Sequence, residues 1–288
     1  MLNVGLAHWE ETAERIRDPL AERGIQVEHL SITESVTDLT GPTALPDVDV
    51  GLFFPGRITE GGVLTALRDV PWVNGREAIL RSRSKAETIA RLSAADVPVP
   101  ETTVVSNPAD RSAVAAAFDR IGAPVVVKPN STTRGLGVCK VNDPDSLFGV
   151  LDYLELIHEF PVTRDRTYLL QEYLPEARDL RVMVMDGEVV GAVERSLPDE
   201  ARSAGRWKHN VHAGAEATGI DPDPETRALA ERVADVMDIP LVGVDVLQTP
   251  DRTVVSETNA RPTIDEASKY EDGFYDRFAA LLRETAPG

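Results

Sequence analysis

The chain has 288 residues, of which 42% are hydrophobic, so it can bury a substantial core and wholesale disorder is excluded. Its 48 acidic and 30 basic residues give a formal net charge of -18. A surface with this charge repels phosphate backbones and anionic lipid heads, which argues against nucleic-acid and membrane partners. Any anionic ligand must instead be held by a local cationic pocket.

Only five of the basic residues are lysines, and either adaptation to high salt or a GC-rich coding bias would explain the excess of arginine. The single cysteine, Cys139, excludes an intrachain disulfide and a cysteine-rich zinc site. The chain does not start with a basic segment followed by an apolar one, and no apolar run reaches about 18 residues. We therefore expect a soluble, cytoplasmic protein.

The first 80 residues alternate between strand and helix patterns. Apolar alternation predicts strands over 2–7 and 26–32, with a helix over 11–23 between them. A near-continuous apolar run predicts a buried parallel strand over 49–54, followed by a helix over 63–68. We therefore expect a small parallel α/β domain over residues 1–82.

The later two-thirds of the chain predict antiparallel pairing. A helix begins at a capping box formed by Ser84 and Glu87, and a hairpin over 181–195 turns at Asp186-Gly187. The fold class is therefore α+β with an N-terminal α/β unit, followed by a central subdomain over 83–175 and a C-terminal subdomain over 176–288. Further strands are predicted over 102–105, 124–128, 136–141, 168–172, 241–248 and 253–260, and further helices over 109–121, 144–157, 224–237 and 274–283.

A loop rich in hydroxyl groups and glycine follows a buried strand that ends in Lys128. The segment VVVKPNSTTRGLG offers one lysine charge and unhindered backbone N–H groups, which suit a polyphosphate. It is not a Walker A motif, because GxxxxGK[ST] is absent. Taken alone, the segment fits a glycine hairpin with an exposed lysine equally well.

An apolar strand ends in polar residues at Glu172. If this strand and Lys128 line one cleft, main-chain groups of residues 172–174 can pair with an adenine edge while Leu174 packs on its face. Asp179 can then accept hydrogen bonds from ribose hydroxyls. An ordinary strand end with Tyr173 in the core is the alternative.

Three oxygen-bearing side chains occupy the predicted strand pair near the C-terminus. Glu257 and Asn259 are two residues apart, so they project from one face of a strand, and Asp245 lies on its predicted partner. Two carboxylates and an amide suit Mg²⁺ shared with phosphate oxygens. Two solvated acids are the alternative, but both acids lie in apolar runs, where an unpaired charge would cost several kcal/mol.

Cationic residues gather over residues 181–212, from the hairpin onwards. Such clustering is unexpected in a chain of charge -18, and arginine forks suit carboxylate and phosphate groups. Pairing with surface acids is the competing explanation for some of them, and a zinc site at the two histidines lacks an evident third ligand. The cluster comprises Arg181, Arg195, Arg206, Lys208, His209 and His212, with Asn210 among them.

In this order, these features resemble the ATP-grasp superfamily, and within it the RimK-like branch of ATP-dependent carboxylate–amine ligases, the α-L-glutamate ligases. The resemblance covers about residues 80–262. It departs from the family after Asn259, where Ala260-Arg261-Pro262-Thr263 replaces a small residue followed by Pro-Gly, so the acceptor substrate is open. The matching blocks are SRSKAETIARLSAADVPVPET, VVVKPNSTTRGLGV, LLQEYLPEARDLRVMVMDGEVVGAVER, WKHNVHAG, GVDVLQ and VVSETNA.

The resemblance implies ATP and Mg²⁺, or Mn²⁺ in its place, as cofactors. It implies a flexible loop over 131–137 that covers the phosphates, and it assigns the metal to Asp245, Glu257 and Asn259. It places Arg195, Arg206 and Asn210 near the phosphoryl and acyl groups. The residues it assigns to ATP are Lys85, Lys128, Ser131, Thr132, Gly135 and Gly137 for the phosphates, Gln171, Glu172, Tyr173 and Leu174 for adenine, and Asp179 for ribose.

The activity implied is amide-bond formation through an acyl phosphate, with an amino acid such as glutamate added to a small molecule, a cofactor or a carrier protein. The substrates would be a carboxylate and an amine, and family members are often oligomers. A small-molecule kinase and a Mg-ATP-binding regulatory module without turnover are the alternatives. Lys140 has no assigned role, and we expect its substitution to be near neutral.

Overall fold

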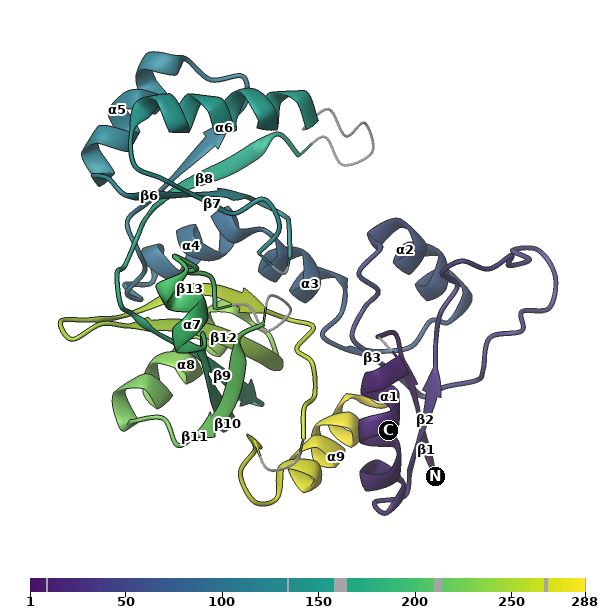
Figure 1. Ribbon diagram of the computed structural model, residues 1–288. Coiled ribbons are helices and arrows are strands. Elements are labelled where there is room, and N and C mark those ends of the chain that lie inside the picture. Colours follow the sequence, from purple (N-terminus) through teal and green to yellow (C-terminus); the bar gives the residue numbers. More distant parts are fainter. Residues whose placement is uncertain (9, 134, 158–164, 210–213, 267–268, 288) are drawn as a thin grey trace.

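The computed structural model describes residues 1–8, 10–133, 135–157, 165–209, 214–266 and 269–287, and three β-sheets organise them (Figure 1). The N-terminal sheet is parallel, with strand order β2-β1-β3-β4. Apolar side chains on α1, among them Ile16 and Leu20, are fully buried against this sheet. The elements are β1 (Leu2–Leu6), α1 (Glu10–Ala21), β2 (Ile25–His29), β3 (Val50–Leu52), α2 (Ile58–Leu67), β4 (Trp72–Val73) and α3 (Arg76–Arg83).

The central sheet is antiparallel, with order β5-β8-β6-β7. Helices α5 and α6 lie together on one face of it (Figure 1), where Phe118 and Leu147 pack with Val127 and Leu170. Lys128 therefore projects from the opposite face, because successive side chains on a strand alternate. The elements are β5 (Thr102–Ser106), α5 (Arg111–Ile121), β6 (Val125–Pro129), β7 (Cys139–Val141), α6 (Pro144–Ile157) and β8 (Thr167–Glu172).

The C-terminal sheet is also antiparallel, with order β11-β10-β9-β12-β13. Residues 180, 182 and 184 of β9 and 242, 244 and 246 of β12 are buried in one core with helix α8. The elements are β9 (Arg178–Met185), β10 (Glu188–Ser196), α7 (Asp199–Ser203), β11 (Glu216–Ile220), α8 (Pro224–Met237), β12 (Leu241–Gln248), β13 (Thr253–Asn259) and α9 (Phe274–Thr285).

The other face of the C-terminal sheet changes character along its length. Met183 and Met185 of β9 join the core of the N-terminal domain, whereas Asp179 and Arg181, on the same face, are charged. The apolar end is covered by the N-terminal sheet and by α9, which lies beside α1 in Figure 1. The charged end is left for the functional site.

Long-range contacts join the N-terminal and C-terminal parts of the chain. Phe274 and Phe278 of α9 pack in the same core as Val4. The buried Asn74 side chain donates to the carbonyls of Leu241 and Ala260, at 2.5 and 2.7 Å. Helix α4 (Lys85–Ala94) packs on α8 and β13, so it belongs by contact to the C-terminal sheet.

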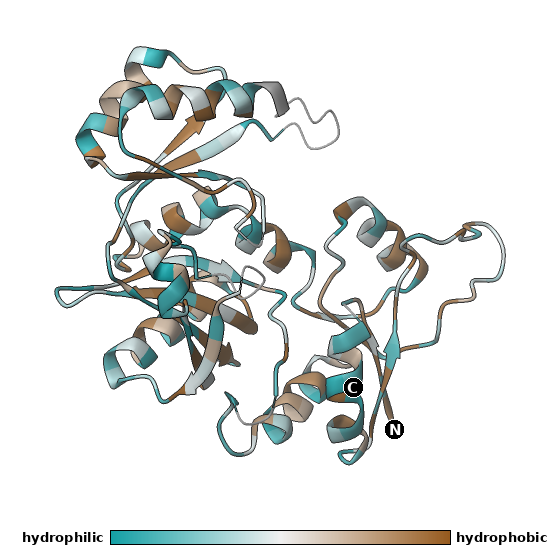
Figure 2. Cartoon of the chain, in the orientation of Figure 1, coloured by the Kyte–Doolittle hydropathy of each residue, from teal (hydrophilic) through white to brown (hydrophobic). Residues whose placement is uncertain are grey.

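The expected α+β fold with a parallel N-terminal unit is confirmed, and α8 has the predicted bounds. Ser84 caps α4 as predicted, because its hydroxyl accepts from the backbone N–H of Glu87. Figure 2 shows hydrophobic residues along the strands and hydrophilic ones on outward-facing helix surfaces. No helix in the described ranges combines the length and apolar character needed to cross a bilayer. Elements that the sequence did not predict are β4, α3, α7 and β11.

Candidate active site

Strand register brings the predicted site residues of the C-terminal sheet into one row. Arg195 on β10 pairs with Asp179 on β9, and two residues further along β9, Arg181 pairs with Asp245 on β12. Asp245 in turn pairs with Glu257 on β13. Because neighbours across strands share a face, all five side chains project from the charged end of the sheet.

Asp245 lies at the centre of this row and is held by two arginines. Arg181 donates from Nε to Oδ1 at 2.6 Å and from Nη2 to Oδ2 at 2.8 Å, and Arg195 Nη2 lies 3.0 Å from Oδ2. Burial alone would raise the pKa of Asp245, but the charges of Arg181 and Arg195 outweigh it, so the pKa lies well below its usual range. Asp245 is therefore an ionised carboxylate in a fixed orientation.

Asp179 also lies beside Arg195, but the positive charge near it offsets less of the effect of burial than at Asp245. Its Oδ1 accepts from Arg195 Nε at 3.1 Å and Nη2 at 2.5 Å, and its Oδ2 lies 3.6 Å from His209 Nδ1. Burial raises the pKa of Asp179 to about 6, against the opposing charge of Arg195. Asp179 thus belongs to the charged row, and its role at ribose stays a prediction.

Glu257 and Asn259 complete the predicted metal ligands. Glu257 has no hydrogen bond or ion pair with any described residue, although its charge acts on Lys128, Arg181 and Arg195. Asn259 Oδ1 accepts from the backbone N–H of Arg261 at 2.9 Å, which fixes the amide. Within the described ranges no group of three His, Cys, Asp or Glu side chains could hold a metal. The three hard oxygen donors fit Mg²⁺ only as a partial set that phosphate oxygens and water complete.

Lys128 approaches this row from the central sheet. Its Nζ donates to Gln171 Oε1 at 2.6 Å, and Gln171 Nε2 donates to Thr102 Oγ1 at 2.9 Å. Burial lowers the pKa of Lys128, while the charges of Glu257 and other nearby acids oppose that shift. Lys128 and Glu257 therefore share one site, although 128 residues separate them in sequence. Gln171, which the resemblance assigned to adenine, positions the lysine here.

Lys85 and the glycine-rich loop close the site from the side of α4. Lys85 Nζ donates to the carbonyls of Asn130, at 3.4 Å, and Thr132. Ser131 Oγ donates to Asp165 at 2.6 Å, and Thr132 Oγ1 donates to the carbonyl of Leu136 at 2.9 Å.

Glycine is required within this loop. Gly135 and Gly137 have φ values of 69° and 72°, in the left-handed region. A Cβ at Gly137 would also lie 2.8 Å from Pro129 Cγ. The loop therefore keeps its backbone close to β6, beside Lys128.

An aromatic pair borders the predicted adenine position. The rings of Tyr173 and Trp207 meet edge to face with centroids 5.7 Å apart. Lys140 Nζ lies 4.3 Å from the Tyr173 centroid and 5.4 Å from that of Trp207, and Lys208 Nζ lies 3.4 Å from the carbonyl of Gly135. Lys140 therefore touches the predicted nucleobase region. Sequence reasoning assigned no role to Lys140 or Trp207, because neither residue type alone marks a nucleotide site.

The remaining predicted residues are less informative. Glu172 accepts from the backbone N–H of Glu101 at 2.7 Å and from Arg252 at 2.5 Å, which ties the end of β8 to the β12–β13 hairpin. Leu174 is partly buried at the same strand end. Arg206 is exposed on the loop after α7, and Asn210 and His212 lie outside the described residues. The roles of Arg206 and Asn210 stay predictions.

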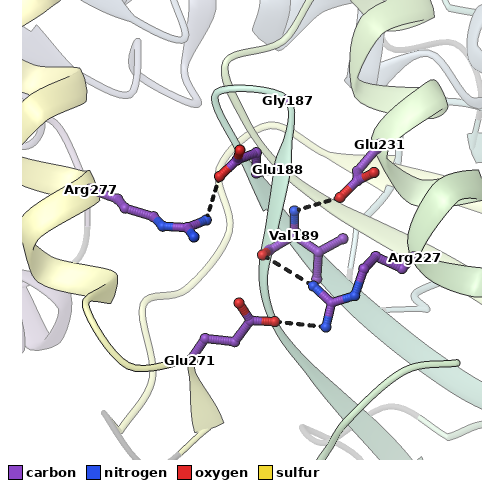
Figure 3. Close-up of a pocket in the computed structure, with 7 residues that line it drawn as sticks. All are labelled: Gly187, Glu188, Val189, Arg227, Glu231, Glu271 and Arg277. Atoms are coloured by element: carbon purple, nitrogen blue, oxygen red, sulfur yellow. Dashed lines mark hydrogen bonds and ion pairs between the residues drawn. The ribbon is translucent and has the colours of Figure 1, made fainter. Parts of the chain in front are cut away.

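A cavity of about 330 Å³ lies at the far end of the β9–β10 hairpin, away from this site (Figure 3). Its charges are paired: Glu188 meets Arg277 at 2.7 Å, and Glu271 meets Arg227 at 2.8 Å. Glu231 accepts from the backbone N–H of Val189 at 3.2 Å. With its acids already partnered, the cavity offers no reaction centre.

The decisive comparison is with protein families: residues 82–273 match the RimK-like ATP-grasp domain. The chain belongs to this family. The match spans all the elements that carry the charged row, Lys128 and the glycine-rich loop. It begins at the end of α3, close to the predicted boundary between the first and second subdomains.

Curated relatives of this RimK-like protein share about a third of its residues in the matched region. A protein named probable alpha-L-glutamate ligase from Citrobacter koseri is 30% identical over 200 residues, covering 68% of this chain and 62% of the relative. One of the same name from Hydrogenovibrio crunogenus is 32% identical over 195 residues, covering 67% and 60%. The chain therefore spans about three fifths of the length of these relatives.

Solved structures support the fold over the whole chain. A RimK domain ATP-grasp protein from Sphaerobacter thermophilus superposes with a TM-score of 0.69 at 24% identity, covering 99% of this chain and 100% of that one. The D-alanine–D-alanine ligase of Bacillus anthracis complexed with ATP gives 0.69 at 17% identity, covering 99% and 97%. At these identities the likeness concerns the fold alone.

Proposed function

We propose that this RimK-like protein is an ATP-dependent carboxylate–amine ligase. In the proposed reaction, a carboxylate oxygen of the substrate attacks the γ-phosphorus of ATP, and ADP leaves. The amine then attacks the carbonyl carbon of the acyl phosphate, phosphate leaves with the C–O electron pair, and the amine releases a proton. Glutamate is the amino acid suggested by the names of the curated relatives.

The protein's part in this reaction is charge compensation and positioning. Lys128, held by Gln171, and Lys85, on the glycine-rich loop, would neutralise phosphate oxygens. Arg195, buried between Asp179 and Asp245, keeps its charge, because the two acids outweigh the burial that would lower its pKa. None of these groups needs to form a covalent bond with the substrate.

Magnesium fits the site through Asp245, Glu257 and Asn259. When bound, the ion would supply positive charge to the phosphate oxygens during transfer. Arg181 orients the carboxylate of Asp245 for this role, while Glu257 has no described partner and is available. The glycine-rich loop, in which Thr132 Oγ1 donates to the carbonyl of Leu136, would exclude water from the acyl phosphate.

One relationship carries the proposal: the charge of Glu257, on the C-terminal sheet, opposes the lowering of the Lys128 pKa by burial, which supports a single site for the two side chains. The test is ADP formation from Mg-ATP with a panel of carboxylates and amines, followed by mass spectrometry of the product. ADP release that requires both substrates, with a condensed product, is the expected result. Phosphate transferred stably to a hydroxyl would indicate a kinase, and nucleotide binding without turnover would indicate a regulatory module.

A further inference from the structure

Two chain segments connect the central sheet with the C-terminal sheet and the helices packed on it, and they are joined to each other. Residues 95–101 lead from α4 into β5, and residues 173–177 lead from β8 into β9. Where they meet, the backbone N–H of Glu172 donates to the carbonyl of Glu101 at 2.9 Å. Figure 1 shows the central sheet and the C-terminal sheet as separate layers. The orientation of one sheet relative to the other therefore depends on what holds these two connections.

The β12–β13 hairpin holds both connections. In the first, the carbonyl of Pro98 accepts from the backbone N–H of Val255 at 2.9 Å. At the start of the second, Glu172 Oε2 accepts from Arg252 Nη2 at 2.5 Å. The side chain of Glu172 is 18% exposed and that of Arg252 is 47% exposed, so water screens this ion pair only in part. No other ion pair in the described ranges joins the central sheet to the C-terminal sheet.

The turn that carries Arg252 is itself braced. The backbone N–H of Thr249 donates to the carbonyl of Arg252 at 2.9 Å, and the backbone N–H of Arg252 donates to Thr249 Oγ1 at 3.2 Å. Just before the turn, Gln248 accepts from Arg178 at 2.8 Å and donates to Asp223 at 3.1 Å. Arg252 therefore extends from a fixed turn towards Glu172.

The same hairpin carries two of the candidate metal ligands. Asp245 and Glu257 pair across it. Thr253, the first residue after the turn, lies about 13 Å from Glu257 along β13, at about 3.3 Å per residue. The segment 172–174, which is predicted to hold adenine, begins where Arg252 binds. One hairpin therefore contacts the predicted positions of both ends of the nucleotide.

We propose that Arg252 is a positioning residue for the nucleotide, because it holds residues 172–174 at a set distance from the metal ligands Asp245 and Glu257. This inference rests on the proposed function, since it concerns ATP at the same site. A ligand with two linked binding groups gains affinity only when both of its sites are within reach together. Fixing the two sites before binding also removes part of the cost of ordering them. Arg252 acts through Glu172 and does not need to touch the nucleotide.

The test measures how two nucleotides displace a labelled ATP analogue from the full chain in the presence of Mg²⁺. A non-hydrolysable ATP analogue reaches from the adenine position to the metal ligands, whereas AMP lacks the β- and γ-phosphates. In Arg252→Gln, we expect the ATP analogue to bind about fivefold more weakly, the upper range for a partly exposed ion pair. AMP should bind within about twofold of its wild-type affinity, because Glu172 keeps both of its hydrogen bonds with Glu101.

Three further variants test the same contact. Arg252→Lys keeps the positive charge and should bind the ATP analogue within about twofold of the wild type. Arg252→Glu places a like charge beside Glu172 and should bind the analogue more weakly than Arg252→Gln does. Arg120→Gln is the matched control, because Arg120 is also exposed and pairs with Glu101, at 3.4 Å, without reaching the hairpin. This control should bind both nucleotides as the wild type does.

The results separate this inference from the proposed function. Three outcomes would overturn the positioning role alone: unchanged affinity for the ATP analogue in Arg252→Gln, an Arg252→Lys variant that binds no more tightly than Arg252→Gln, or equal weakening of AMP and the analogue. Equal weakening would mean that Arg252 only supports the shape of the adenine position. A wild-type protein that AMP cannot displace the label from would also overturn it, since residues 172–174 would then not hold the base. Failure of the wild type to bind the ATP analogue would overturn the proposed function, and this inference with it.

Discussion

Arg181 and Asp245, paired across β9 and β12, form a two-pronged ion pair with distances of 2.6 and 2.8 Å. The carboxylate of Asp245 is almost fully buried, with 3% of its side chain exposed. A buried carboxylate with two fixed donors has a fixed orientation, and Asp245 keeps it directly across from Glu257, its register partner on β13. This pair defines the candidate metal site before any metal binds.

Removing Arg181 should therefore destabilise the fold. In Arg181→Gln, Asp245 keeps Arg195 but loses its bidentate partner in a buried setting, and we expect the free energy of unfolding to fall by about 3 kcal/mol. Urea denaturation followed by circular dichroism measures this change. Arg178→Gln is the matched control on the same strand, since its pair with Glu194 is exposed and should contribute less than about 1 kcal/mol. Equal losses in the two variants would contradict the assignment.

Trp207 should contribute to nucleotide affinity. It reaches from the loop after α7 to Tyr173 and Lys140, which belong to the central part of the chain. An edge-to-face pair and a cation–π contact are each worth about 1 kcal/mol, so Trp207→Leu should weaken binding of an ATP analogue roughly fivefold or more. Fluorescence titration with a labelled analogue measures this effect. Tyr153→Leu, an exposed aromatic on α6, should leave the affinity unchanged.

The contacts of Lys140 lead to an expectation that differs from the one drawn from the sequence. Its ammonium lies over the Tyr173 ring, so Lys140→Met should weaken the binding of the same ATP analogue severalfold. The sequence alone indicated a near-neutral change. The same titration measures it. Affinity equal to that of the wild type would mean that the ring contacts do not form part of the nucleotide site.

His8 should make stability depend on pH. Burial, with a further effect from Arg261, lowers the pKa of His8 from 6.5 to about 4. Its Nδ1 lies 2.8 Å from Thr12 Oγ1, its ring centroid lies 5.5 Å from that of Phe53, and its carbonyl accepts from His29 Nε2 at 3.1 Å. The folded state therefore binds the proton less well than the unfolded state. The contribution of neutral His8 to the free energy of unfolding is therefore fully present above pH 6.5 and is lost as the pH falls towards 4.

The loss attributable to His8 amounts to about 3 kcal/mol over this range. His8→Asn keeps a polar side chain beside Thr12 but does not titrate, so its free energy of unfolding should fall less between pH 7 and pH 4 than that of the wild type. Urea denaturation at several pH values compares the two. Parallel pH profiles would show that His8 is not held neutral in the folded state.

The sequence predicted the fold and most of the charged row because both depend on local patterns. The two-residue spacing of Glu257 and Asn259 placed them on one strand face, and the capping box at Ser84 predicted the start of α4. It did not reveal the pairing of Arg181 with Asp245, because register between β9 and β12 depends on the whole sheet. Nor did it reveal the change from charge to methionine along β9, which reflects where the N-terminal domain docks.

The most direct test of the central claim measures the affinity of Mg²⁺ and an ATP analogue for four proteins: wild type, Lys128→Met, Glu257→Gln and the double variant. If both side chains act on one triphosphate, each single variant should bind at least tenfold more weakly. The double variant should then depart from additivity by about 1 kcal/mol, as residues at one site do. Wild-type affinity in both single variants would show that residues 128 and 257 do not share a nucleotide site.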